Sequence, residues 1–126
     1  MPTTGVLLLQ SDPASYGRVM QSVGKQFLNV EAVSAASELG TAIARLRAPL
    51  AIVDLELIRF EELAELCAEF PSTAVVCVHR LADESMWTQS LALGAVDCCL
   101  ASEVPKILQA SDRYVATKQL RKVSAA

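Results

Sequence analysis

The sequence predicts an α/β domain in which a parallel sheet is covered by helices on both faces. Five short apolar runs stand at similar intervals along the 126 residues, and segments with helical periodicity lie between them. The runs are apolar throughout, which is typical of strands that are buried on both faces. Strands that alternate with helices in this way predict a (βα)5 arrangement in one domain.

The five predicted strands are short, and each should bring its last residues to one edge of the sheet. In an open α/β sheet that edge is where ligands bind. The second run, VEAV, is the weakest of the five. The runs cover residues 6–9, 30–33, 50–53, 74–78 and 95–100.

Apolar residues at helical spacing mark a helix after each run. The turn residues agree, because Pro13 suits the first turn of a helix and Gly94 suits the end of one. Ser102 can cap the last helix. The marking residues are Val19, Met20, Val23 and Phe27; then Leu39, Ile43 and Leu46; then Leu57, Ile58, Leu63, Leu66 and Phe70; then Met86, Trp87, Leu91 and Leu93; and finally Ile107, Leu108, Tyr114 and Val115.

Composition argues against several classes of protein. The formal net charge is −3 and the 11 basic residues are scattered, so no basic face is expected to bind nucleic acid. No apolar run approaches the roughly 20 residues of a membrane helix, and the N-terminus lacks the features of a signal peptide. The four cysteines lack CxxC spacing and lie in apolar runs, which favours buried thiols in a cytoplasmic protein.

No common catalytic motif is present. GxGxxG, GxxxxGK[ST] and GxSxG are all absent. His79 is the only histidine, and nothing marks a nucleophile that would work with it. Cys77 shares a strand face with His79, but two ligands do not complete a zinc site. We therefore expect that the protein is not an enzyme, with an enzyme on this fold as the weakest of three alternatives.

Four stretches resemble, in order and spacing, the receiver domain of bacterial two-component response regulators. VLLLQSDP is similar to the first strand and its loop, APLAIVDLEL to the third strand, STAVVCVHR to the fourth, and ALGAVDCCLAS to the approach to the fifth. The resemblance covers about residues 5–120. It implies a flavodoxin-like (βα)5 fold whose doubly wound, five-stranded parallel sheet has the order 2-1-3-4-5, in a single receiver-like domain over residues 1–126.

The resemblance places Asp54 where the family has its phosphorylatable aspartate, at the tip of the third strand. In the family that aspartate and an acidic pair after the first strand hold a magnesium ion. Here Gln10 and Ser11 occupy the positions of the pair, and Asp12 lies one place further on. Ala101 replaces the lysine that ends the fifth strand. Because magnesium takes its charge mainly from carboxylates and phosphate, we expect no cofactor, and weak Mg²⁺ binding at most.

The two switch positions of the family also differ. His79 replaces the fourth-strand Thr or Ser that bonds the phosphoryl group, and Cys98 replaces the fifth-strand aromatic residue. The resemblance therefore implies a degenerate pocket formed by Gln10, Ser11, Asp12, His79 and Ala101. It also implies that the residues which normally couple phosphorylation to a conformational change are missing.

Single residues keep alternative interpretations. Asp54 is either a loop-capping carboxylate, a working phosphoacceptor or a ligand of another kind. His79 either fills part of the pocket or provides a pH-dependent cation for Asp54. Asp12 is either a helix cap or a weak cation ligand. Trp87, in the fourth predicted helix, is either an interface anchor or a core residue.

These residues favour a pseudo-receiver, a signal-transduction module that acts mainly by protein–protein contacts. The alternative is a phosphorylatable response regulator that accepts phosphate on Asp54 from a histidine kinase in a phosphorelay. The expected partner is a histidine kinase or an output protein, with no nucleic acid and no membrane. The fourth helix, fifth strand and fifth helix form the expected contact or homodimer face. The sequence does not name the partner, the oligomeric state or a further output domain.

Overall fold

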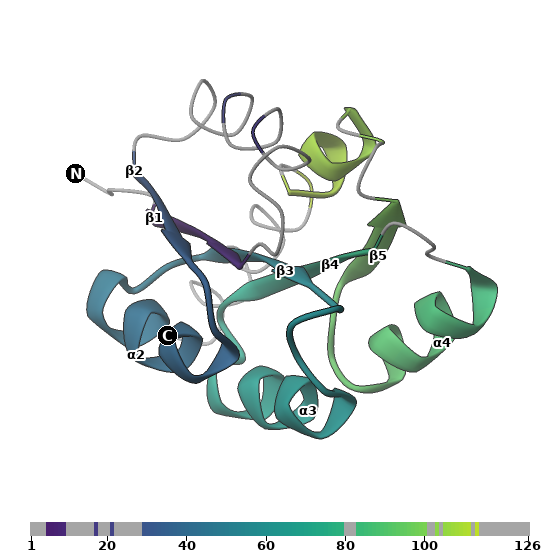
Figure 1. Cartoon of the computed structure of the whole chain (residues 1–126), viewed down its shortest axis with the longest axis horizontal. Coiled ribbons are helices and arrows are strands. Elements are labelled where there is room, and N and C mark those ends of the chain that lie inside the picture. The colour runs from purple at the N-terminus through teal and green to yellow at the C-terminus, as the bar shows by residue number, and fades with distance from the viewer. Residues whose placement is uncertain are drawn as a thin grey trace.

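Five strands form one sheet in which every neighbouring pair runs parallel (Figure 1). The computed structural model of the chain describes residues 5–9, 17, 21, 29–79, 83–100, 103, 105–111 and 113. The α/β class and the parallel sheet that the sequence predicts are confirmed. The strands are β1 (Gly5–Leu9), β2 (Asn29–Val33), β3 (Leu50–Asp54), β4 (Ala74–His79) and β5 (Asp97–Leu100), in the order β2-β1-β3-β4-β5.

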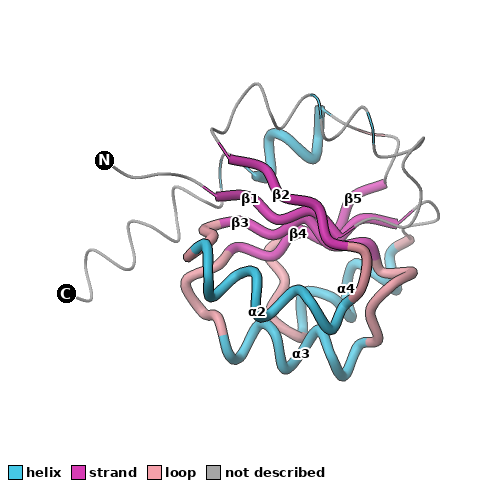
Figure 2. The backbone as a smooth tube through the Cα atoms, turned by 60° about the vertical axis from the view of Figure 1, so that its left-hand side comes forward, coloured by secondary structure: helices cyan, strands magenta, loops and turns pink. Residues whose placement is uncertain are grey.

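Helices lie on both faces of this sheet. The helices α2 (Ala36–Leu46), α3 (Phe60–Glu69) and α4 (Glu84–Ala92) cover one face, and the helical residues 105–111 lie on the other (Figure 2). The residues that mark the first predicted helix, Val19, Met20, Val23 and Phe27, lie outside the described residues, while Gly17 and Gln21 between 13 and 27 are helical. In the part of the chain that the structure describes, no helix is long and apolar enough to cross a membrane.

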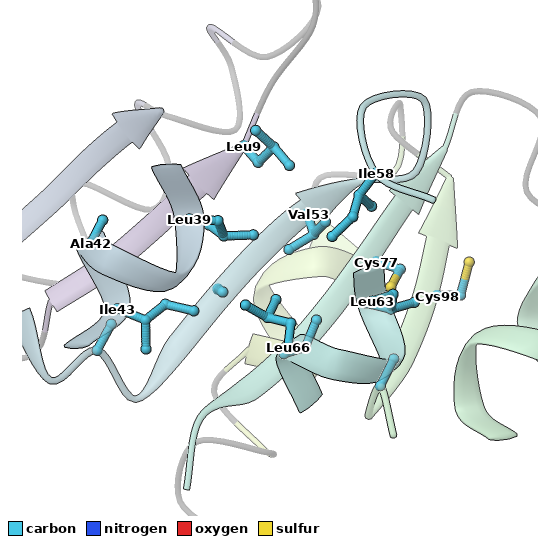
Figure 3. Close-up of a cluster of buried hydrophobic side chains, with 14 residues drawn as sticks. Leu9, Leu39, Ala42, Ile43, Val53, Ile58, Leu63, Leu66, Cys77 and Cys98 are labelled. Carbon is cyan, nitrogen blue, oxygen red and sulfur yellow. The ribbon is translucent and has the colours of Figure 1, made fainter. Parts of the chain in front are cut away.

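The two faces of the sheet build two separate hydrophobic clusters. Leu9, Val53, Cys77 and Cys98 are register partners across four strands, and they pack with α2 and α3 on one face (Figure 3). Since successive side chains of a strand point to opposite faces, the intervening residues pack on the other face. That second cluster contains Leu50, Ile52, Ala74, Val76, Val78, Cys99, Ile107 and Ala110.

The start of α3 differs from the sequence prediction. Leu57 and Ile58, which the pattern assigned to the third helix, lie in the preceding turn, and α3 begins at Phe60. The cause is local, because Arg59 takes the N-cap position and its backbone N–H donates to the Glu62 carboxylate over 2.9 Å. Ile58 nevertheless packs into the first cluster, so its apolar character serves the core and not the helix.

Asp83 and Gly94 mark the two ends of α4, and the chain turns at Gly94 toward β5. Asp83 caps the helix, and its carboxylate accepts a 2.9 Å hydrogen bond from the backbone N–H of Met86. Gly94 follows the end of the helix with φ of +115°, a conformation that favours glycine. The predicted role of Gly94 at this helix end is therefore confirmed.

Candidate functional site

Asp54 is the last residue of β3 and lies at the carboxyl edge of the sheet. It is the register partner of Val78 on β4, and β3 lies between β1 and β4, so Asp54 stands at the middle of the sheet and not at an outer edge. Its residue surface is only 1% exposed, although its side chain is polar. A buried carboxylate must be satisfied by hydrogen bonds or by a cation.

The loop that follows Asp54 supplies one of the hydrogen bonds that its carboxylate needs. The backbone N–H of Glu56 donates to the Asp54 Oδ1 atom over 2.9 Å. The N–H of Leu57 donates to the Asp54 carbonyl over 3.0 Å, and the N–H of Leu55 donates to the carbonyl of Val78 over 3.0 Å. Asp54 therefore caps the turn after its own strand, which is one of the roles that the sequence left open.

His79 ends β4 and lies near a carboxylate that the sequence analysis did not consider. Its Nε2 atom is 3.9 Å from the Glu56 Oε1 atom, and its side chain is 11% exposed. The contact becomes an ion pair only when the imidazole is protonated. Glu56 thus links two neighbours, because its backbone bonds Asp54 and its side chain faces His79.

Cys98, to which the resemblance assigns a switch position, is a buried cysteine. Cys98 is buried beside its register partner Cys77, and neither forms a disulfide. Burial raises the pKa of both thiols, and it raises the pKa of Cys99 on the opposite face to about 12. These side chains stay protonated and pack as small apolar residues, as the sequence predicts.

Several predicted site residues cannot be placed. Gln10, Ser11, Asp12 and Ala101 lie outside the described residues. Within the described ranges, no group of three or more His, Cys, Asp or Glu side chains is arranged to hold a metal ion. The structure therefore brings together Asp54, Glu56 and His79, and leaves the rest of the pocket as a sequence prediction.

A second candidate surface surrounds Trp87 on α4. The residue is 47% exposed, the only large hydrophobic residue so exposed among those described. Its indole Nε1–H donates to the Asp97 Oδ1 atom on β5 over 3.3 Å. Its neighbour Met86 packs against the first cluster instead. The core interpretation of Trp87 is therefore wrong, and an exposed aromatic side chain remains beside β5.

Comparison with known proteins identifies the fold. No protein-family model and no curated protein matches the sequence. A signal receiver domain from Vibrio parahaemolyticus is 16% identical with a TM-score of 0.86, and each chain is covered to 99%. A CheY-like receiver domain protein from Methanospirillum hungatei is 18% identical with a TM-score of 0.82, over 95% of this chain and 99% of that one.

A third solved structure comes from Burkholderia pseudomallei. It is a response regulator protein with a phosphorylated aspartic acid, a calcium ion and citrate, and it is 17% identical with a TM-score of 0.75. The match covers 94% of this chain and 72% of that one. At such identities the likeness establishes the fold. The chain has the CheY-like receiver fold of response regulators, as the sequence predicts.

Proposed function

We propose that this chain is a degenerate receiver in two-component signal transduction, which acts by binding another protein and not by phosphoryl transfer. The observation that supports this proposal most directly is the burial and hydrogen bonding of Asp54. Its residue surface is 1% exposed and its Oδ1 atom already accepts a loop N–H. A phosphodonor must approach such a carboxylate, so burial and prior hydrogen bonding both oppose the reaction.

The residue types around Asp54 support the same proposal. By resemblance, Gln10 and Ser11 stand where the family has carboxylates, and Ala101 stands where it has a lysine. A hard cation prefers several oxygen ligands that carry charge, so this set fits magnesium poorly. Each missing electrostatic group commonly costs about 3–4 kcal/mol of transition-state stabilisation. We therefore infer that the protein is not an enzyme and uses no cofactor, with weak Mg²⁺ binding at most.

The rival function is a phosphorylatable response regulator that takes phosphate on Asp54 from a histidine kinase. One observation favours it: Asp54 stands at the carboxyl end of the central strand β3, where an open α/β sheet places its ligands. The phosphorylated aspartic acid of the Burkholderia pseudomallei protein shows that the fold can carry this modification.

An intact-mass measurement separates the two functions. The whole chain is incubated with acetyl phosphate and Mg²⁺, and Asp54→Asn is the control because it keeps the hydrogen-bond acceptor. We expect no gain of a phosphoryl group. A gain that Asp54→Asn abolishes would establish the rival.

Magnesium binding is tested separately by titration followed through amide chemical shifts. We expect no saturable change in the natural chain at millimolar Mg²⁺. The double substitution Gln10→Asp and Ser11→Asp should create one, because it restores the two carboxylates that the resemblance assigns to these positions. A saturable shift in the natural chain would contradict the inferred loss of the metal site.

The proposed setting is the cytoplasm of a bacterium, and the proposed partner is a histidine kinase or an output protein. The scaffold is the doubly wound sheet in the order β2-β1-β3-β4-β5. The contact face is formed by α4, β5 and the helix at 105–111, with Trp87 as its anchor. Self-association through this face is the alternative to a different partner, and sedimentation of the isolated chain distinguishes them.

A further inference from the structure

Trp87 is an exposed aromatic side chain whose ring is held by a hydrogen bond. Its indole Nε1–H donates to the Asp97 Oδ1 atom over 3.3 Å, and the same oxygen accepts the backbone N–H of Cys98 over 2.8 Å. The residue is nevertheless 47% exposed. The hydrogen bond engages the N–H edge of the ring and does not use its π-faces. An exposed indole that is held in this way is suited to contact a ligand.

Two carboxylates of α4 flank this indole. Asp83 lies four residues before Trp87 and Glu84 lies three, and side chains at these spacings are neighbours on a helix surface. The backbone N–H of Trp87 donates to the Asp83 carbonyl over 3.0 Å, so the turn that relates them is formed. Asp83, Glu84, Trp87 and Asp97 line one groove along β5, with a volume of about 1000 Å³. We call these four residues the acidic corner.

The acidic corner carries negative charge that is not neutralised within the described part of the chain. None of its three carboxylates forms an ion pair there. The cations that line the groove, Lys106 and Arg113, come from helical residues on the other face of the sheet (Figure 2), and Lys106 is paired with Glu103 at 3.0 Å. This distribution of charge favours a cationic ligand beside α4.

The negative charge also acts on β5. Burial is the main cause that raises the pKa of the Cys98 thiol, and the carboxylates of Asp97 and Asp83 raise it further. The same carboxylates that line the groove therefore disfavour another anion at this place, as they would favour a cation.

Side chains, and not the backbone of β5, form the contact points of the acidic corner. The backbone N–H of Cys98 already donates to Asp97, and the carbonyl of Leu100 already accepts the N–H of Glu103 over 3.0 Å. A ligand is therefore recognised by a side chain that reaches into the groove, whatever the conformation of its backbone.

Arginine is the cationic side chain that fits this combination of groups. A guanidinium can stack on an indole face and donate hydrogen bonds from its edge to carboxylates at the same time. Here Asp83 and Glu84 flank the indole on α4, and Asp97 lies at its N–H edge. Lysine carries a compact, strongly hydrated ammonium group, which cannot match both features as well.

We propose that the acidic corner binds an arginine side chain on an exposed segment of the partner protein, with the guanidinium over the Trp87 indole. This rests on the proposed function, because it takes the partner to be a protein that contacts α4 and β5. The charge of the groove and the exposed indole together select this occupant. A second copy of the chain is the alternative occupant, and the test below distinguishes it.

The test uses the only tryptophan of the sequence as its reporter. A capped pentapeptide, with one arginine between two pairs of glycines, is added to the ¹⁵N-labelled whole chain. We expect a saturable change in Trp87 fluorescence and in its indole N–H resonance at millimolar peptide. The same peptide with citrulline, which keeps the shape of arginine but not its charge, should bind about tenfold more weakly. The lysine peptide should bind about threefold more weakly, and added salt should weaken the arginine peptide.

Substitutions in the acidic corner complete the test. Glu84→Gln and Asp97→Asn should each weaken the arginine peptide about threefold, and Asp97→Asn keeps an acceptor for the indole. Trp87→Leu, followed through the Cys98 amide, should weaken it about fivefold because the π-face is lost. Asp83 is left unchanged because it caps α4. Glu65→Gln, an exposed carboxylate on α3, is the matched control and should have no effect.

Four outcomes overturn the proposal. They are the lack of any saturable change with the arginine peptide, equal binding of the citrulline peptide, equal binding of the lysine peptide, and undiminished binding by both Glu84→Gln and Asp97→Asn.

Sedimentation of the peptide-free chain tests the other occupant. A dimer that Trp87→Leu dissociates would assign the acidic corner to a second copy and overturn the proposal. A protein partner that binds through Trp87 without an arginine would also overturn it, but would leave the proposed function standing. Phosphorylation of Asp54 would instead overturn the proposed function and leave the arginine site intact.

Discussion

Gly94 shows how one residue sets the path from α4 to β5. Its φ is +115°, and a Cβ atom at this position would lie 2.7 Å from the Cβ atom of Cys67. Gly94→Ala should therefore lower the free energy of unfolding by about 1–3 kcal/mol, from backbone strain and from the clash. Urea denaturation measures this.

Gly40 provides the matched control. It lies inside α2, and among the described residues its added Cβ atom would meet Phe70 Cε2 at 3.7 Å, an ordinary contact. Gly40→Ala should raise the free energy of unfolding by up to about 1 kcal/mol, from helix propensity. Equal effects of the two substitutions would contradict the assigned conformation of Gly94.

The buried thiols give stability a dependence on alkaline pH. The pKa of Cys99 rises from 9.0 to about 12 in the folded chain, mainly because burial disfavours the thiolate. The unfolded chain therefore loses a proton that the folded chain keeps. The contribution is fully present below pH 9.0 and is lost progressively as the pH rises toward about 12. Unfolding measured from neutral to alkaline pH should show this decline, and Cys99→Ala should make it shallower. An unchanged slope would contradict the assignment.

The sequence predicted the position of some site residues but not their contacts. The apolar run before Asp54 placed that carboxylate correctly at a strand end, because a short run and its first charge indicate where burial stops. The contact between Glu56 and His79 could not be predicted in this way. These residues are distant in sequence, and only the parallel register of β3 and β4 brings them together.

At the scale of elements, α4 depends on its cap more than on its burial. Ser90 is its one buried residue, whereas α2 and α3 bury leucine and isoleucine side chains. Asp83→Ala should therefore lower the free energy of unfolding by about 1 kcal/mol, because the N–H of Met86 loses its acceptor. Asp83→Asn keeps an acceptor and should be nearly neutral. Hydrogen exchange in the first turn of α4 gives a local measure, and equal exchange in the two variants would exclude the cap as the cause.

The elements also show where sequence patterns mislead. Leu57 and Ile58 have the apolar spacing of a helix but lie in a turn, since Asp54 accepts a hydrogen bond from the loop and Arg59 is the N-cap of α3. The apolar pattern predicted correctly that these residues pack against the core, but it assigned them to the third helix and not to the turn before it. Strand positions were predicted more closely, because buried parallel strands are apolar along their whole length.

At the scale of the whole molecule, the fold class could be predicted and the groove could not. The alternation of strands and helices predicts the parallel sheet, and the order of strands came from the family resemblance. The groove along β5, about 1000 Å³ in volume, depends on how the start of α4 lies relative to Glu103, Lys106 and Arg113 at one sheet edge. No local sequence pattern predicts how far apart these elements lie in the folded chain. The only sequence signal was Trp87, an aromatic residue among polar neighbours in ESMWTQS.

The whole molecule should work as a fixed contact surface and not as a phosphorylation switch. A ligand shifts a conformational equilibrium only through different affinity for two states, and by resemblance both switch positions have lost their usual residues, at His79 and Cys98. Asp54→Ala, and phosphodonor added to the natural chain, should therefore leave binding through the face of α4 and β5, to a partner or to a second copy, unchanged. Trp87→Ala should weaken it about tenfold, because that anchor acts whatever the state of Asp54. Sedimentation of the natural chain and both variants, each with and without phosphodonor and Mg²⁺, measures self-association through this face. A phosphodonor-dependent change that Asp54→Ala abolishes would show that β3 and the β5 face are coupled, and that the receiver still switches.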